Sequence, residues 1–136
     1  AAPVFVCRQD RKSNAVVWET VPYKPKEQSA ERVTFVFAGG LGFSSEPKTE
    51  GFVLDVNGKE ALRFDMPAPE RWTSADGRVE LRFEPRRAVS VDQFGLFYLT
   101  VARDMLTPGQ PCLLRVRSLG TGSRRWFGLN KYTDVR

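Results

Sequence analysis

Apolar and polar residues alternate with a period of two along most of this chain. The alternation is clearest in three segments, which are residues 32–37, 78–84 and 112–117. In the second of them Val79, Leu81 and Phe83 alternate with charged residues. This pattern is typical of antiparallel strands with one face on a core and the other in water. Helical periodicity is nearly absent, so the sequence predicts an all-β fold.

Residues 51–65 predict a β-hairpin around Asn57 and Gly58. A two-residue loop would pair Val56 with Lys59 and divide the apolar residues between the two faces. A three-residue loop, residues 56–58, places four apolar side chains on one face, namely Phe52, Leu54, Leu62 and Phe64. We prefer this second register because a one-residue slip would reverse the faces. It requires Gly58 in a left-handed conformation.

Residues 94–101 are apolar at nearly every position. They predict a central strand covered on both faces, or a strand with one exposed apolar face. A short helical turn is expected over residues 103–106. The predicted loops are residues 23–31, 39–50, 67–77, 85–93 and 118–124. About eight short strands at this spacing indicate a single antiparallel β-sandwich or jelly roll over residues 1–136.

The composition fits one domain with an ordinary charged surface. The chain has 136 residues and a net charge of +5, with 41% hydrophobic residues. Its basic residues are interleaved with acidic ones, which indicates a mixed-charge surface. We therefore expect no nucleic-acid partner, because neither a basic stripe nor a module signature is present. No apolar run approaches the roughly 18–20 residues that span a bilayer, so no membrane association is expected.

The chain contains no histidine. This excludes Ser-His-Asp and Cys-His nucleophile arrangements and removes the usual general base near neutral pH. The glycines at 39, 40 and 42 are not followed by a phosphate-binding pattern. A carboxylate pair remains open, and its candidate residues are Glu46, Glu50, Asp65, Glu70 and Asp92. The sequence favours a domain that is not itself an enzyme, with no cofactor.

Two further questions stay open at this point. A structural calcium ion is one, with Asp10, Asp76 and Asp92 as candidate ligands and no distinguishing pattern. The other is whether Cys7 and Cys112 form a disulfide or remain two buried thiols. A disulfide between them would close a loop of about 100 residues and stabilise the fold by a few kcal/mol.

Aromatic and arginine side chains in loops supply the candidate ligand site. An exposed indole stacks on the apolar face of a sugar ring, and an arginine pairs with a carboxylate or sulfate on an acidic glycan. Trp72, in a polar loop, is the first candidate, and Trp126 with Arg124 and Arg125 is the second. Phe43 is expected to form an adjacent wall. The alternative for each tryptophan is a position in the core.

Two segments resemble galactose-binding-like jelly-roll domains of carbohydrate-active enzymes. One is the strand and turn 51–59, which contains Val-Asn-Gly-Lys at 56–59. The other is 99–116, in which two strands flank Leu106-Thr107-Pro108-Gly109. Pro111 stands near a position where that family often has asparagine. The resemblance implies a glycan-binding or packing module attached to a catalytic domain.

The sequence therefore predicts a non-catalytic carbohydrate-binding module, with acidic glycans among the candidate ligands. The start at Ala1-Ala2-Pro3, without methionine, suggests a processed chain that is secreted, periplasmic or at the cell surface. The main alternative is a structural or protein-interaction domain packed on a neighbour. A small polysaccharide lyase or hydrolase is the third.

Overall fold

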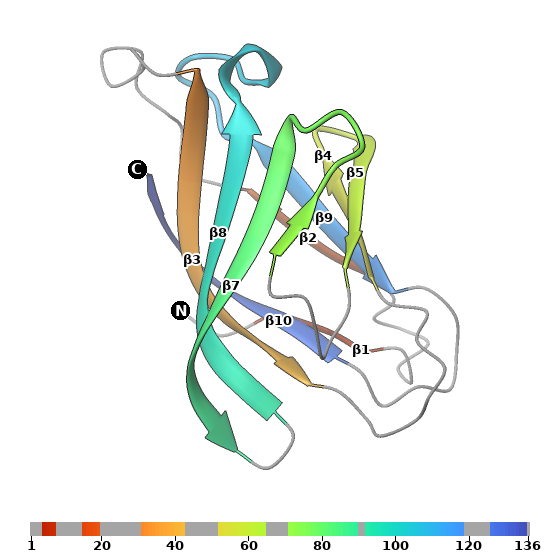
Figure 1. The fold of residues 1–136 in the computed structure, drawn as a ribbon, viewed down its shortest axis with the longest axis vertical. Coiled ribbons are helices and arrows are strands. Elements are labelled where there is room, and N and C mark those ends of the chain that lie inside the picture. Colours follow the sequence, from red (N-terminus) through yellow and green to blue (C-terminus); the bar gives the residue numbers. More distant parts are fainter. Residues whose placement is uncertain are drawn as a thin grey trace.

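Figure 1 shows the computed structural model, which describes residues 4–7, 15–19, 31–42, 52–64, 71–89, 92–118 and 126–135. These residues form two sheets in which every strand pair is antiparallel. The described part of the chain contains no helix long and apolar enough to cross a membrane. The prediction of an antiparallel all-β sandwich is confirmed, while its jelly-roll subtype stays a prediction.

One sheet has six strands, in the order β1 (Val4–Cys7), β10 (Trp126–Val135), β3 (Arg32–Gly42), β8 (Asp92–Ala102), β7 (Val79–Val89) and β6 (Arg71–Thr73). The other has four, in the order β2 (Ala15–Glu19), β9 (Leu113–Ser118), β4 (Phe52–Val56) and β5 (Lys59–Phe64). A single 3₁₀ turn, η2 (Arg103–Met105), follows β8 in the described residues, where the sequence predicts a short helical turn.

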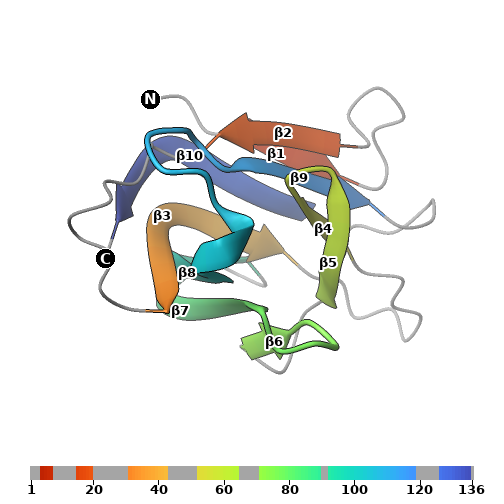
Figure 2. The same cartoon turned by 90° about the horizontal axis from the view of Figure 1, so that it is seen from above.

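The two sheets approach each other at both sides of the sandwich. Seen from above in Figure 2, the six-stranded sheet bends so that β1 and β10 lie near β2 and β9. At this side β1 contacts both β2 and β9, and at the opposite side β5 contacts β6 and β7. The core is thus enclosed between β3, β8 and β7 on one side and β9, β4 and β5 on the other.

Alternate residues of each strand form this core, as the period-two pattern predicts. Phe97 on the central strand β8 is 0% exposed, and its ring centroid lies 5.4 Å from that of Phe37 and 4.7 Å from that of Phe83. On the other face of β8 the side chains of Phe94, Leu96 and Tyr98 are half-buried. The strand is therefore central in its sheet, with a buried inner face and a partly covered outer face.

The β4–β5 hairpin combines features of both registers that the sequence allows. The turn is the two-residue loop, with Val56 opposite Lys59 and with Asn57 and Gly58 both at positive φ, 49° and 83°. A register shift after Leu54 then places the apolar residues of both strands on one face, as in the preferred register, although with different partners. Phe52 lies opposite Phe64 and Leu54 opposite Leu62, and all four are buried. The shared face was predicted correctly, and the three-residue loop was wrong.

Four predicted loops contain strand residues, one of them only at Ser118, where β9 ends. β3 continues to Gly42, β6 lies within 67–77, and β7 and β8 together occupy most of 85–93. Pro85 and the two arginines after it suggested a loop. The chain stays in the sheet there because Arg86 forms a β-bulge between Pro85 and Arg87. Among the described strands, residues 83–89 of β7 also have no neighbour on the β6 side, and such an edge tolerates proline.

The strand register does not support a disulfide between Cys7 and Cys112. Cys7 lies in the same row as Trp126 and Gly42, at one end of β3. Cys112 precedes β9 beside the turn that follows β8, at the Arg32 end. The 11 residues of β3 separate these ends by roughly 30 Å along the strand. A disulfide requires Cα atoms within about 7 Å of each other.

We expect two thiols per chain when the protein is unfolded without a reductant. In the folded protein Cys112 should react slowly with a thiol reagent at pH 8, because it is 1% exposed and burial raises its pKa to about 11. A Cys7→Ser variant leaves Cys112 as the reacting thiol, and Ellman titration with and without urea measures its reaction rate. Fewer than two thiols in unfolded wild type would contradict the register argument.

The same burial predicts a pH dependence of stability. The pKa of the Cys112 thiol is higher in the folded than in the unfolded chain. The contribution of the buried thiol to the free energy of unfolding is therefore complete below pH 9 and is lost as pH rises toward about 11. Urea unfolding of wild type and Cys112→Ala across this range isolates that loss from other titrations. Parallel pH profiles for the two proteins would contradict it.

Candidate functional site

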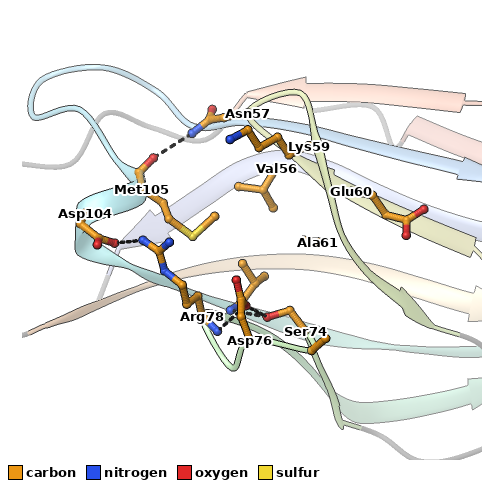
Figure 3. Close-up of a pocket in the computed structure, with 12 residues that line it drawn as sticks. Val56, Asn57, Lys59, Glu60, Ala61, Ser74, Asp76, Arg78, Asp104 and Met105 are labelled. Atoms are coloured by element: carbon orange, nitrogen blue, oxygen red, sulfur yellow. Dashed lines mark hydrogen bonds and ion pairs between the residues drawn. The ribbon is translucent and has the colours of Figure 1, made fainter.

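A pocket of about 510 Å³ opens at the end of the sandwich where both sheets turn. Three segments form it: the β4–β5 turn with the start of β5, the β6–β7 connection, and η2. Figure 3 shows the hairpin side chains on one side, those of the β6–β7 connection facing them, and Met105 between. Its lining residues are Val56, Asn57, Lys59, Glu60, Ala61, Ser74, Ala75, Asp76, Arg78, Val79, Asp104 and Met105.

Asn57 fixes the hairpin wall against the rest of the fold. Its backbone N–H donates to the Leu113 carbonyl at 2.8 Å, and its Oδ1 accepts from the Leu113 N–H at 2.9 Å. Its Nδ2 donates to the Met105 carbonyl at 3.1 Å. One side chain therefore joins the β4–β5 turn to both β9 and η2. Asparagine also tolerates the left-handed backbone that this turn requires.

We expect Asn57→Ala to lower the free energy of unfolding by about 2 kcal/mol, because two hydrogen bonds and a suitable left-handed residue are lost together. Asn57→Gly keeps the backbone conformation and should cost about half as much. Urea unfolding of the three proteins measures the difference. Equal stability of wild type and Asn57→Ala would show that these bonds contribute nothing.

Asp76 is held on the opposite wall by neutral donors. Its Oδ1 accepts from the Arg78 backbone N–H at 3.0 Å and from the Ser74 hydroxyl at 2.8 Å. These two hydrogen bonds, the backbone one first, hold the pKa of the Asp76 carboxyl below its usual value. The carboxylate is therefore ionised at neutral pH, and the side chain is exposed. Asp76 therefore offers the pocket a hydrogen-bond acceptor and not a proton donor.

The remaining charges of the pocket are mostly paired. Arg78 forms an ion pair with Asp104, and Glu60 accepts from Arg117 at 3.3 Å. Lys59 makes no ion pair with any residue whose side chain the structure describes. Each wall thus carries one charge without an ionic partner among these residues, an ammonium on the hairpin and the Asp76 carboxylate facing it.

The sequence prediction of an exposed Trp72 was wrong. Trp72 belongs to β6 and is 9% exposed, with its ring centroid 5.5 Å from that of Phe64. It fills the core where β6 meets β5, because a three-residue strand inside the polar segment turns its indole inward. A buried indole offers no face to a sugar, so Trp72 is removed from the candidate site.

The structure also separates Trp72 from Trp126. Through β7 and β8 the ladder connects Trp72 with the row of Phe35 on β3, while Trp126 lies opposite Gly42. The stretch of β3 between these two rows corresponds to roughly 23 Å. The side chain of Trp126 lies outside the described residues, as do Phe43, Arg124 and Arg125 in full. Their ligand-binding role stays a prediction.

Sequence reasoning missed the pocket, apart from Asp76 as a calcium candidate. Its residues come from three separate turns, and only the Asn57–Gly58 signal marked one of them. Among the described residues no group of three or more His, Cys, Asp or Glu could hold a metal ion. Asp10 and the side chain of Asp92 are not described, so calcium at those positions stays open.

No known protein family, curated protein or solved structure matches the chain.

Proposed function

We propose that this domain is a non-catalytic carbohydrate-binding module whose site is the pocket at the end of the sandwich. The observation that carries the proposal is the chemistry of the pocket lining. A sugar ring has an apolar C–H face and a rim of hydroxyls. The pocket matches this with an apolar floor of Val56, Ala61, Val79 and Met105 beneath a polar rim. Its volume of about 510 Å³ is within the range of small-ligand sites.

The rim offers both hydrogen-bond donors and acceptors. Lys59 can donate from the hairpin, while Asp76 can accept from the facing wall. Hydroxyls take either role, so neutral sugars satisfy both groups without burying an unpaired charge. Three carboxylates and two cationic side chains line the pocket, which gives it one excess negative charge. This balance favours neutral over acidic sugars at this site.

The wider setting follows from the resemblance to galactose-binding-like domains. We propose an exported, carbohydrate-active protein in which this chain is an accessory domain beside a catalytic one. The alternating Arg-Glu surface supports neither nucleic acid nor membrane as the main partner.

Two competing functions have weaker support. A packing module should show an exposed apolar patch on residues 94–101, whereas the outward side chains there are half-buried and Leu113 is the one large hydrophobic residue exposed among those described. A carboxylate-based enzyme needs an acid with a raised pKa. In the pocket the pKa of Asp76 is lowered instead, and Asp104 is paired with Arg78.

Glycan-array screening followed by calorimetry tests the proposal. Lys59→Met with Asp76→Asn removes both unpaired charges, and the amide introduced at position 76 can still accept from Ser74 and Arg78. We expect at least tenfold weaker binding of the best neutral oligosaccharide. Arg71→Met with Glu80→Gln is the matched control, because it removes one ion pair from the outer sheet face. No glycan bound by wild type, or equal affinity in both double variants, would overturn the proposal.

A further inference from the structure

Three arginines lie together on the outer face of the six-stranded sheet, away from the pocket. Arg82, Arg86 and Arg87 belong to β7, and we call them the arginine strip. Tyr98 and Phe94 of the neighbouring strand β8 lie beneath two of them. The strip is on the outer face because the alternate residues of β7, from Val79 to Phe83, are buried in the core.

The β-bulge at Arg86 creates the strip. In a regular strand two consecutive side chains point to opposite faces, so Arg86 and Arg87 would be separated. Arg86 is instead the extra residue between the pairs that Pro85 and Arg87 make with β8. Its guanidinium contacts Glu84, and Arg87 lies over Phe94, so both arginine side chains lie on the outer face of the sheet. Bulges commonly redirect a side chain in this way.

Aromatic stacking and ion pairing hold the guanidinium groups in place. The Arg82 guanidinium lies 4.1 Å from the Tyr98 ring centroid and 3.6 Å from a Glu84 oxygen. Arg86 bonds the other oxygen of Glu84 at 2.6 Å, and Arg87 lies 5.7 Å from the Phe94 centroid. Arg82 and Arg86 therefore share the Glu84 carboxylate, and with Arg87 the strip has three cations to one carboxylate, an excess of two positive charges. Stacking on a ring fixes an arginine without consuming its hydrogen-bond donors.

From this geometry we infer a second binding site, in which the arginine strip binds acidic polysaccharide through its carboxylate or sulfate groups. The groups fit because guanidinium binds planar or tetrahedral oxyanions through two parallel hydrogen bonds. Arg86 is 61% exposed and accessible to a chain lying across the sheet. This site goes beyond the proposed pocket, which favours neutral sugars, and does not depend on it.

Polysaccharide fits the strip better than nucleic acid does. A single-stranded nucleic acid needs open aromatic faces for base stacking. Here Arg82 covers Tyr98 and Arg87 lies over Phe94. The next ion pair along the sheet, Arg71 with Glu80, adds no net charge to the strip.

Affinity electrophoresis of the full chain tests the inference, with polygalacturonate as the carboxylate probe, dextran sulfate as the sulfate probe, and neutral dextran as the blank. Arg86→Gln with Arg87→Gln should weaken binding of at least one acidic polymer about tenfold, as expected for the loss of two charge-assisted contacts. Arg63→Gln with Arg115→Gln is the charge-matched control on the four-stranded sheet and should change affinity less than about twofold. Binding should weaken as salt rises from about 50 to about 200 mM.

Three results would overturn the inference. One is equal loss in both double variants, which would indicate net charge alone. The second is the absence of acidic-polymer binding by wild type at about 50 mM salt, where screening is weak. The third is tighter binding of duplex DNA than of either polymer, which would assign the strip to nucleic acid. The pocket variant should keep its affinity for acidic polymers, so failure of the pocket proposal remains distinguishable.

Discussion

Phe97→Ala is expected to lower the free energy of unfolding by about 3–5 kcal/mol, a large part of the total for a domain of this size. Phe97 is 0% exposed on the central strand of the six-stranded sheet, between Phe37 and Phe83. Its removal leaves a cavity that three adjacent strands cannot close without breaking their ladder. Two ring contacts are lost with the buried area. Urea or thermal unfolding followed by circular dichroism measures the change.

Phe94→Ala is the matched control, because Phe94 is on the same strand but its side chain is half-buried on the outer face. We expect a cost of about 1 kcal/mol there, since less apolar area is buried. Similar losses for the two variants would show that the inner and outer faces of β8 are wrongly assigned. If Phe97→Ala does not fold, Phe97→Leu should give a smaller, measurable loss in the same direction.

The buried faces of β3 and β7 show what the sequence predicts well. The inward residues of β3 up to Phe37 and of β7 up to Phe83 were readable from the alternation, because burial on one face imposes a period of two. The face that Phe52 and Phe64 share followed from the same rule. The hairpin turn was not predicted, because a bulge lets a two-residue turn satisfy both the backbone and the core.

The candidate site was less predictable. The pocket joins Lys59, Asp76 and Asp104, which are far apart in sequence and carry no common motif. Trp72 illustrates the opposite error, because its polar neighbours suggested a loop while β6 turns the indole into the core. Local composition does not show which short segment joins a sheet edge, since that depends on partners distant in the chain.

Gly95→Ala is expected to be nearly as destabilising as Phe97→Ala, at about 3 kcal/mol or more. A Cβ at Gly95 would clash with the Glu84 carbonyl oxygen and lie 3.0 Å from the Arg86 nitrogen. Both atoms belong to the backbone of the bulge, so no side-chain rotation relieves the clash. Gly58→Ala is the control, because a Cβ there meets nothing within 4 Å and only the positive φ is strained. It should cost about 1 kcal/mol.

Deleting Arg86 should partly rescue Gly95→Ala, because the clash depends on the bulge. Pro85 already pairs with Gly95 and Arg87 with Phe94, so removal of the residue between them leaves a regular ladder. Urea unfolding should show the double variant to be more stable than Gly95→Ala alone. A double variant less stable than either single change would mean that the bulge is not the source of the clash. Rescue would show that Gly95 leaves room for the bulge. The bulge in turn places Arg86 and Arg87 on the same face of the sheet.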